Sequence, residues 1–162
     1  MYCGIDNGLQ GAIVFRKNDI RIYPMPVLEK IINKSKRHVY DYKTIYEIFI
    51  TELFYDEPCN CVLEEAQVFG IEGKVTTFTI GKNFGFMEGL LLGLKVETKI
   101  VPPKEWQKFF GISGKKGDTK IQAEQIVNNK FPEIPTRTKG GRLLDGICDA
   151  LLMSEYAKQI MR

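Results

Sequence analysis

The chain is organised around residues 141–153, which read GRLLDGICDALLM. The apolar residues recur at helical spacing, yet Asp145 and Asp149 stand among positions that should be buried. The two aspartates are four residues apart, so they share one helix face with Cβ atoms roughly 5–6 Å apart. Two like charges there destabilise a helix unless a cation binds beside them, and Mg²⁺ is the simplest candidate because hard divalent ions take carboxylate oxygens. In the alternative interpretation Asp145 only stabilises the helix N-terminus and Asp149 is exposed.

Two further stretches place acids at the ends of expected strands. Residues 1–6 end at Asp6, and residues 59–64 end at Glu64, which Glu65 follows. If these strands are parallel neighbours, their carboxyl ends lie at one edge of the sheet, where ligands bind in open sheets. The final helix would bring its aspartates to the same place, and carboxylates that meet without basic partners must hold metal or protons. The alternatives are a turn residue for Asp6 and a solvated strand end for the glutamates.

The remaining pattern predicts an α/β fold, a mixed five-stranded sheet flanked by helices, in a single domain over residues 1–162. Strands are expected at residues 1–6, 12–16, 20–23, 59–64 and 96–101. Helices are expected at residues 40–55, 76–94 and 104–110, from a cap at Asp118 or Thr119 to Lys130, and over the final segment. Thr119 and Gln122 have the spacing of a capping box, and the basic residues 30–38 are expected to form a mobile loop.

Charge is distributed unevenly along the chain. The net charge is +3, but residues 99–142 hold ten Lys or Arg against four Asp or Glu. A basic segment beside an acidic remainder suits a phosphate-backbone ligand. The four cysteines lack C-x-x-C spacing, which argues against zinc, and three of them lie in apolar contexts and are expected to be reduced core thiols. No apolar run could span a bilayer and no signal peptide is evident, so an intracellular protein without membrane association is expected.

Four glycines, Gly81, Gly85, Gly89 and Gly93, recur every four residues within one expected helix. Each glycine in a helix interior costs about 1 kcal/mol relative to alanine. The stripe therefore predicts a partner packed very close to it: the sheet, a neighbouring helix or the same helix of a second subunit. An interface between helices or subunits is favoured.

The three acidic blocks together resemble a known family. GIDNG at residues 4–8, LEE at 63–65 and DGICDAL at 145–151 are similar, in order and spacing, to the active-site blocks of the RuvC-type Holliday-junction resolvases, above all the short phage-type members. The resemblance implies a ribonuclease H-like fold, a homodimer without a nucleotide cofactor, and Mg²⁺-dependent cutting of opposed strands at a four-way DNA junction.

The resemblance also implies roles for individual residues. Asp6, Glu64, Asp145 and Asp149 would bind two Mg²⁺ ions per active site, with Mn²⁺ as a substitute, and Lys120 would stabilise charge on the scissile phosphate. Cellular family members often space the last two acids i, i+3 rather than i, i+4, which leaves open whether Asp145 binds metal directly or through water. The basic segment supplies further candidate DNA contacts, and the alternative for each is an ordinary surface residue: Lys104, Lys108, Lys115, Lys116, Arg137, Lys139 and Arg142. Phe69 would either stack on a base at the junction centre or fold back onto the core.

Three other functions remain open from the sequence. A ribonuclease H-like nuclease for RNA–DNA hybrids, flaps or forks would use the same acids. The segment Asp6–Gly11 also resembles the phosphate-binding hairpin of actin-like and sugar-kinase ATPases, but those proteins need two lobes and a far longer chain. A DNA-binding module without catalysis is disfavoured because all the expected carboxylates are present.

Overall fold

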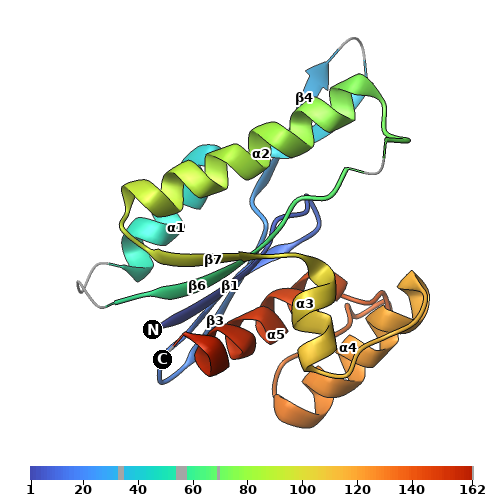
Figure 1. Ribbon diagram of the computed structural model, residues 1–162. Coiled ribbons are helices and arrows are strands. Elements are labelled where there is room, and N and C mark those ends of the chain that lie inside the picture. The colour runs from blue at the N-terminus through green and yellow to red at the C-terminus, as the bar shows by residue number, and fades with distance from the viewer. Residues whose placement is uncertain (33–34, 54–57, 69, 162) are drawn as a thin grey trace.

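A mixed five-stranded sheet forms the middle layer of the molecule (Figure 1). The computed structural model describes residues 1–32, 35–53, 58–68 and 70–161. The strand order is β3-β2-β1-β6-β7, with bounds β1 Tyr2–Asp6, β2 Ala12–Arg16, β3 Ile20–Pro24, β6 Asn60–Glu64 and β7 Glu97–Val101. The first three strands form an antiparallel meander, and β6 and β7 run parallel to β1. The predicted fold class is confirmed.

Helices cover both faces of this sheet (Figure 1). One face packs against α1 (Tyr42–Glu52) and α2 (Lys74–Gly93). On the other face α5 (Asp145–Ile160) lies directly against β1, β2 and β6, while α3 (Pro103–Phe109) and α4 (Lys116–Lys130) pack against α5. Two apolar cores result, one on each side of the sheet.

The alternation of side chains along β1 divides its residues between the two cores. Cys3 and Ile5 are fully buried on the side of α1 and α2, so Gly4 and Asp6 face α5. A Cβ atom at Gly4 would lie 2.1 Å from the carbonyl oxygen of Ala150 and 2.3 Å from the amide nitrogen of Ser154. Glycine therefore allows the backbones of β1 and α5 to touch, and this contact sets the position of α5.

Two local predictions were wrong. The segment expected as a loop forms a hairpin of β4 (Val27–Ile32) and β5 (Ser35–Tyr40), whose strands pair with each other and not with the main sheet. Because the hairpin buries little, its sequence lacks the apolar alternation by which a strand is recognised. The capping box is absent as well, since α4 begins at Lys116 and the Gln122 side chain instead bonds the backbone nitrogen and oxygen of Ser113, at 3.1 and 2.7 Å.

The glycine stripe of α2 contacts nothing within the described part of the chain. No heavy atom lies within 4 Å of the place where a Cβ would stand at any of its four members. Neither the sheet nor a neighbouring helix of the same chain therefore explains the stripe. None of the helices in the described ranges has the length and apolar character needed to cross a membrane.

Candidate active site

The first two acids are placed by the parallel pairing of β1 and β6. Ile5 pairs with Leu63, so Asp6 and Glu64 follow side by side at the carboxyl ends of their strands. Because Ile5 and Leu63 are buried in the core of α1 and α2, alternation turns Asp6 and Glu64 toward α5. Glu65 is exposed, which favours Glu64 over Glu65 as the member of the cluster.

The first turn of α5 brings the other two acids to this edge. Asp145 is the first residue of the helix and Asp149 follows one turn later. A Cβ atom at Gly146 would lie 2.3 Å from the carbonyl oxygen of Gln10 and 3.0 Å from Oδ2 of Asp6. The glycine between the two aspartates therefore permits the helix N-terminus to rest on the turn that follows β1, directly beside the Asp6 carboxylate.

Three of the four carboxyl groups, those of Asp6, Glu64 and Asp149, have raised pKa values. Burial raises the pKa of Asp6 and of Asp149, and burial followed by repulsion from Asp6 raises the pKa of Glu64 to about 7. After burial, repulsion from Asp6, Glu64 and Asp145 raises the pKa of Asp149 further, to well above its ordinary range. Acids from three distant stretches of sequence therefore form one electrostatically coupled cluster.

Two side chains from α3 and α4 hold the outer members of the cluster. The indole Nε1 of Trp106 donates a hydrogen bond of 2.9 Å to Oε1 of Glu64, and Nζ of Lys120 forms an ion pair with Oδ2 of Asp145. The charge of Lys120 opposes, without cancelling, the rise in the pKa of Asp6 and of Asp149. Sequence analysis did not place Trp106 in the site. The available signal was that a buried indole needs a hydrogen-bond acceptor.

The donor set suits a divalent cation. These half-buried carboxylates outnumber the one adjacent lysine, and a hard cation would neutralise the excess of negative charge. Within the described residues, no three His, Cys, Asp or Glu side chains stand in a ligand arrangement. Three of the four carboxylates are instead bonded to other partners, since Asp6 accepts from the amide of Gly8 at 2.9 Å while Glu64 and Asp145 bond Trp106 and Lys120.

The predicted DNA contacts differ in what the structure shows of them. Arg137 is engaged within the chain, because its guanidinium bonds both carboxylate oxygens of Glu124 at 2.6 Å and the carbonyl oxygen of Gly141 at 3.0 Å. Phe69 lies outside the described residues, as does the side chain of Lys116. The remaining five basic residues are exposed: Lys104, Lys108, Lys115, Lys139 and Arg142.

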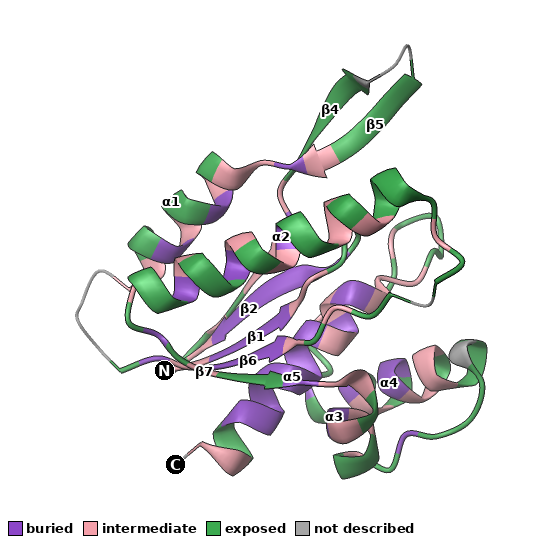
Figure 2. Cartoon of the chain, turned by 45° about the horizontal axis from the view of Figure 1, so that its top comes forward, coloured by how far each residue is buried: buried purple, intermediate pink, exposed green. Residues whose placement is uncertain are grey.

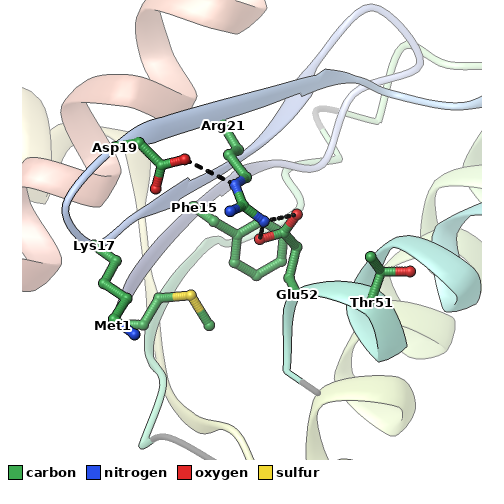
Figure 3. A pocket seen from close by; sticks show the side chains of 7 residues that line it. All are labelled: Met1, Phe15, Lys17, Asp19, Arg21, Thr51 and Glu52. Atoms are coloured by element: carbon green, nitrogen blue, oxygen red, sulfur yellow. Dashed lines mark hydrogen bonds and ion pairs between the residues drawn. The ribbon is translucent and has the colours of Figure 1, made fainter. Parts of the chain in front are cut away.

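A cavity of about 120 Å³ lies at the opposite end of the sheet, next to Met1 (Figure 3). There Arg21 donates to Asp19 at 3.0 Å and to Glu52 at 3.1 Å, so the charges that line the cavity are already paired. None of the clustered carboxylates lines it. The cavity is therefore a weaker candidate for chemistry than the edge that carries Asp6.

The raised pKa values predict that the metal-free protein loses stability as pH rises. A carboxyl whose pKa is higher in the folded than in the unfolded state stabilises the fold below its ordinary pKa, and this contribution is lost as pH rises through the folded value. For Glu64 the window runs from about 4.5 to about 7, with a contribution of about 3 kcal/mol at most.

Thermal unfolding in EDTA at intervals between about pH 5 and 8 measures this effect. The melting temperature should fall across the window, Mg²⁺ should restore it near pH 8, and Glu64→Gln should flatten the profile. A wild-type melting temperature that neither falls with pH nor responds to Mg²⁺ would contradict the electrostatic picture of the cluster.

The sheet order and the helices on both faces are those of a ribonuclease H-like fold. No protein-family model matches the sequence, and no curated protein matches it. Among solved structures, the chain is similar to RuvC of Thermus thermophilus, with a TM-score of 0.54 and 17% identity over 98% of this chain and 95% of that one. It is also similar to the fowlpox virus resolvase in complex with Holliday junction DNA, with a TM-score of 0.51 and 15% identity over 99% of each chain. The fold implied by the sequence resemblance is thereby confirmed.

Proposed function

We propose that this chain is a single-domain, Mg²⁺-dependent endonuclease that resolves four-way DNA junctions by paired nicks. The observation that carries the proposal is the convergence of Asp6, Glu64, Asp145 and Asp149 in one half-buried, mutually repelling cluster. The supporting observation is the shared fold, because one of the structures it resembles is a resolvase complexed with its junction substrate.

The four carboxylates would hold the divalent ions, Mg²⁺ or Mn²⁺. Such ions, when bound, supply Lewis-acid activation of water and neutralise charge on the leaving oxygen of a phosphodiester. The charge of Asp6 acts both on Glu64, at the end of β6, and on Asp149, in α5. Trp106 fixes one oxygen of Glu64 and leaves the other available to a ligand.

Lys120 would stabilise the negative charge that develops on the phosphate during cleavage. Its ammonium group already lies beside the cluster, paired with Asp145. A fixed positive charge at a partly buried site stabilises a developing anion more than it would in water. The exposed lysines of α3 and of the segment before α4 would neutralise neighbouring backbone phosphates, so DNA binding should weaken steeply with salt.

Cleavage of matched, end-labelled substrates tests the proposal. A mobile four-way junction, a fork, a flap, an RNA–DNA hybrid and plain duplex are incubated with Mg²⁺, Mn²⁺ or EDTA, and the nicks are mapped. The proposal expects symmetric nicks in two opposed strands of the junction, only when a metal ion is present. Preferential cutting of the RNA strand of the hybrid would instead identify a ribonuclease, and an intact junction would overturn the proposal.

Paired nicks require two active sites, and the exposed face of α2 is the proposed dimer contact. Phe78 and Leu92 lie at the two ends of the glycine stripe and expose 71% and 80% of their surfaces. At 100° per residue both project on the same side as Gly85. A second copy of the same helix would cover these apolar groups and approach closely across the glycines.

Gly85→Leu is expected to weaken dimerisation by about tenfold or more, equivalent to about 1.4 kcal/mol. The added side chain meets nothing within its own chain, so the variant should remain folded, while it would separate two closely packed helices. Sedimentation analysis over a concentration series measures the change, with Gly117→Ala on α4 as the control. A wild-type protein that remains monomeric at high concentration would refute the dimer contact.

A further inference from the structure

The β4–β5 hairpin projects away from the three packed layers (Figures 1 and 2). Its strands pair from Val27 opposite Tyr40 to Ile32 opposite Ser35, and neither joins the main sheet. Ile31 exposes 76% of its surface. An isolated two-stranded ribbon is marginally stable in water, so this arm depends on its anchorage and on whatever binds it.

The base of the hairpin is fixed beside the carboxylate cluster. The buried Tyr40 donates a hydrogen bond of 2.8 Å from its hydroxyl to Oδ1 of Asn7, the residue that follows Asp6. The amide of Asp41 donates to the carbonyl oxygen of Pro26 at 2.9 Å, which closes the base of the ribbon. Strands of six residues extend about 20 Å, so the arm reaches roughly one duplex diameter beyond the site.

One face of the ribbon carries unbalanced positive charge. Lys30 and Arg37 stand directly opposite each other in the ladder, and both are exposed. Like charges at opposed positions destabilise a strand pair, and within the described residues neither side chain has an ion-pair partner. The only acid of the described ribbon, Glu29, projects from the other face and pairs with Lys36 at 2.9 Å. An anion from outside the chain would relieve this repulsion.

We infer that the Lys30–Arg37 face of the β4–β5 hairpin binds the phosphate backbone of a DNA arm that leaves the active site. This inference rests on the proposed function. The phosphates of a duplex would neutralise the paired charges of Lys30 and Arg37. A two-stranded β-ribbon also has the dimensions to lie against a DNA groove. An acidic protein surface is the competing occupant, but the anchorage of the hairpin beside Asp6 favours the substrate of that site.

Neutralisation of both charges, as Lys30→Gln with Arg37→Gln, tests the inference. Removal of two phosphate contacts should reduce the slope of log K against log salt by about 2 and raise the Kd for a four-way junction roughly tenfold. The double variant should fold at least as well as the wild type, because it loses a repulsion. The matched control is Lys95→Gln with Lys158→Gln, two exposed lysines outside the hairpin, one between α2 and β7 and one in the last turn of α5.

Binding is measured by fluorescence anisotropy in EDTA over a salt series, and cleavage at saturating enzyme is measured in parallel. The inference is supported if only the hairpin variant loses affinity and salt slope, while its cleavage rate at saturation stays near that of the wild type. A wild type that binds and cuts junctions, with a hairpin variant of equal Kd and slope, overturns the inference and leaves the nuclease proposal standing. A wild type that neither binds nor cuts branched DNA overturns both.

Discussion

Asp6→Asn is expected to abolish DNA cleavage while junction binding is retained. Asparagine keeps the shape of the side chain and can still accept the hydrogen bond from Gly8, but it removes the charge that would hold a divalent cation. Asp6 is also the acid whose repulsion acts on both Glu64 and Asp149. Without its charge, the remaining carboxylates repel one another less and attract a cation less strongly. We expect the cleavage rate to fall at least about 10³-fold, equivalent to about 4 kcal/mol of transition-state stabilisation.

Binding should persist because the proposed DNA contacts are lysines and arginines outside the cluster. Anisotropy titration of the junction in Ca²⁺, beside a cleavage assay in Mg²⁺, separates the two effects. Glu64→Gln should inactivate the enzyme in the same way, and Glu65→Gln, a change of the adjacent exposed side chain, should cut nearly as well as the wild type. If Asp6→Asn cleaved DNA at the rate of the wild type, the cluster would not be the active site.

The positions of the acids could be predicted because they depend on strong sequence signals. Short runs of strand formers end at Asp6 and Glu64, and the helical spacing of the last segment puts Asp145 and Asp149 on one face. Parallel pairing of β1 and β6 then leaves little freedom in where these side chains meet. Glu64 was chosen over Glu65 by its position in the motif, and the pairing register of β1 and β6 turns Glu64 toward α5.

The parts that sequence analysis missed depend on contacts between distant residues. The partner of Trp106 is 42 positions away in sequence, and nothing near either residue marks the pair. Arg137 resembled any other basic loop residue until the fold placed Glu124 against its guanidinium. The β4–β5 hairpin was expected to be a loop because its strands are stabilised by each other and by the anchorage of Tyr40, not by an apolar face that the sequence would reveal.

Gly4→Ala and Gly146→Ala are expected to separate two roles of the close contact between α5 and β1, which are to stabilise the fold and to bring the carboxylates together. At Gly4 the new methyl group would overlap backbone atoms of Ala150 and Ser154, which cannot move without shifting the helix. We expect a loss of about 3 kcal/mol or more, and a fall in melting temperature of about 10 °C for a chain of this size. Calorimetry measures the melting temperature and the loss of stability. The control is Gly117→Ala, at an exposed helical glycine with open space around it, which should raise stability by no more than about 1 kcal/mol.

At Gly146 the methyl group would overlap the carbonyl oxygen of Gln10 and touch the Asp6 carboxylate. The first turn of α5 must then lift away from β1, and it carries Asp145 and Asp149 with it, while the Gly4 contact two turns further along the helix still anchors α5. Cleavage should therefore fall at least about a hundredfold, because a displacement near 1 Å of catalytic groups has effects of that order, with a smaller loss of stability than Gly4→Ala produces. The contrary outcome is that both variants lose equal stability and that folded Gly146→Ala cleaves as well as the wild type. The close approach of α5 to Asp6 would then serve packing and not the assembly of the carboxylates.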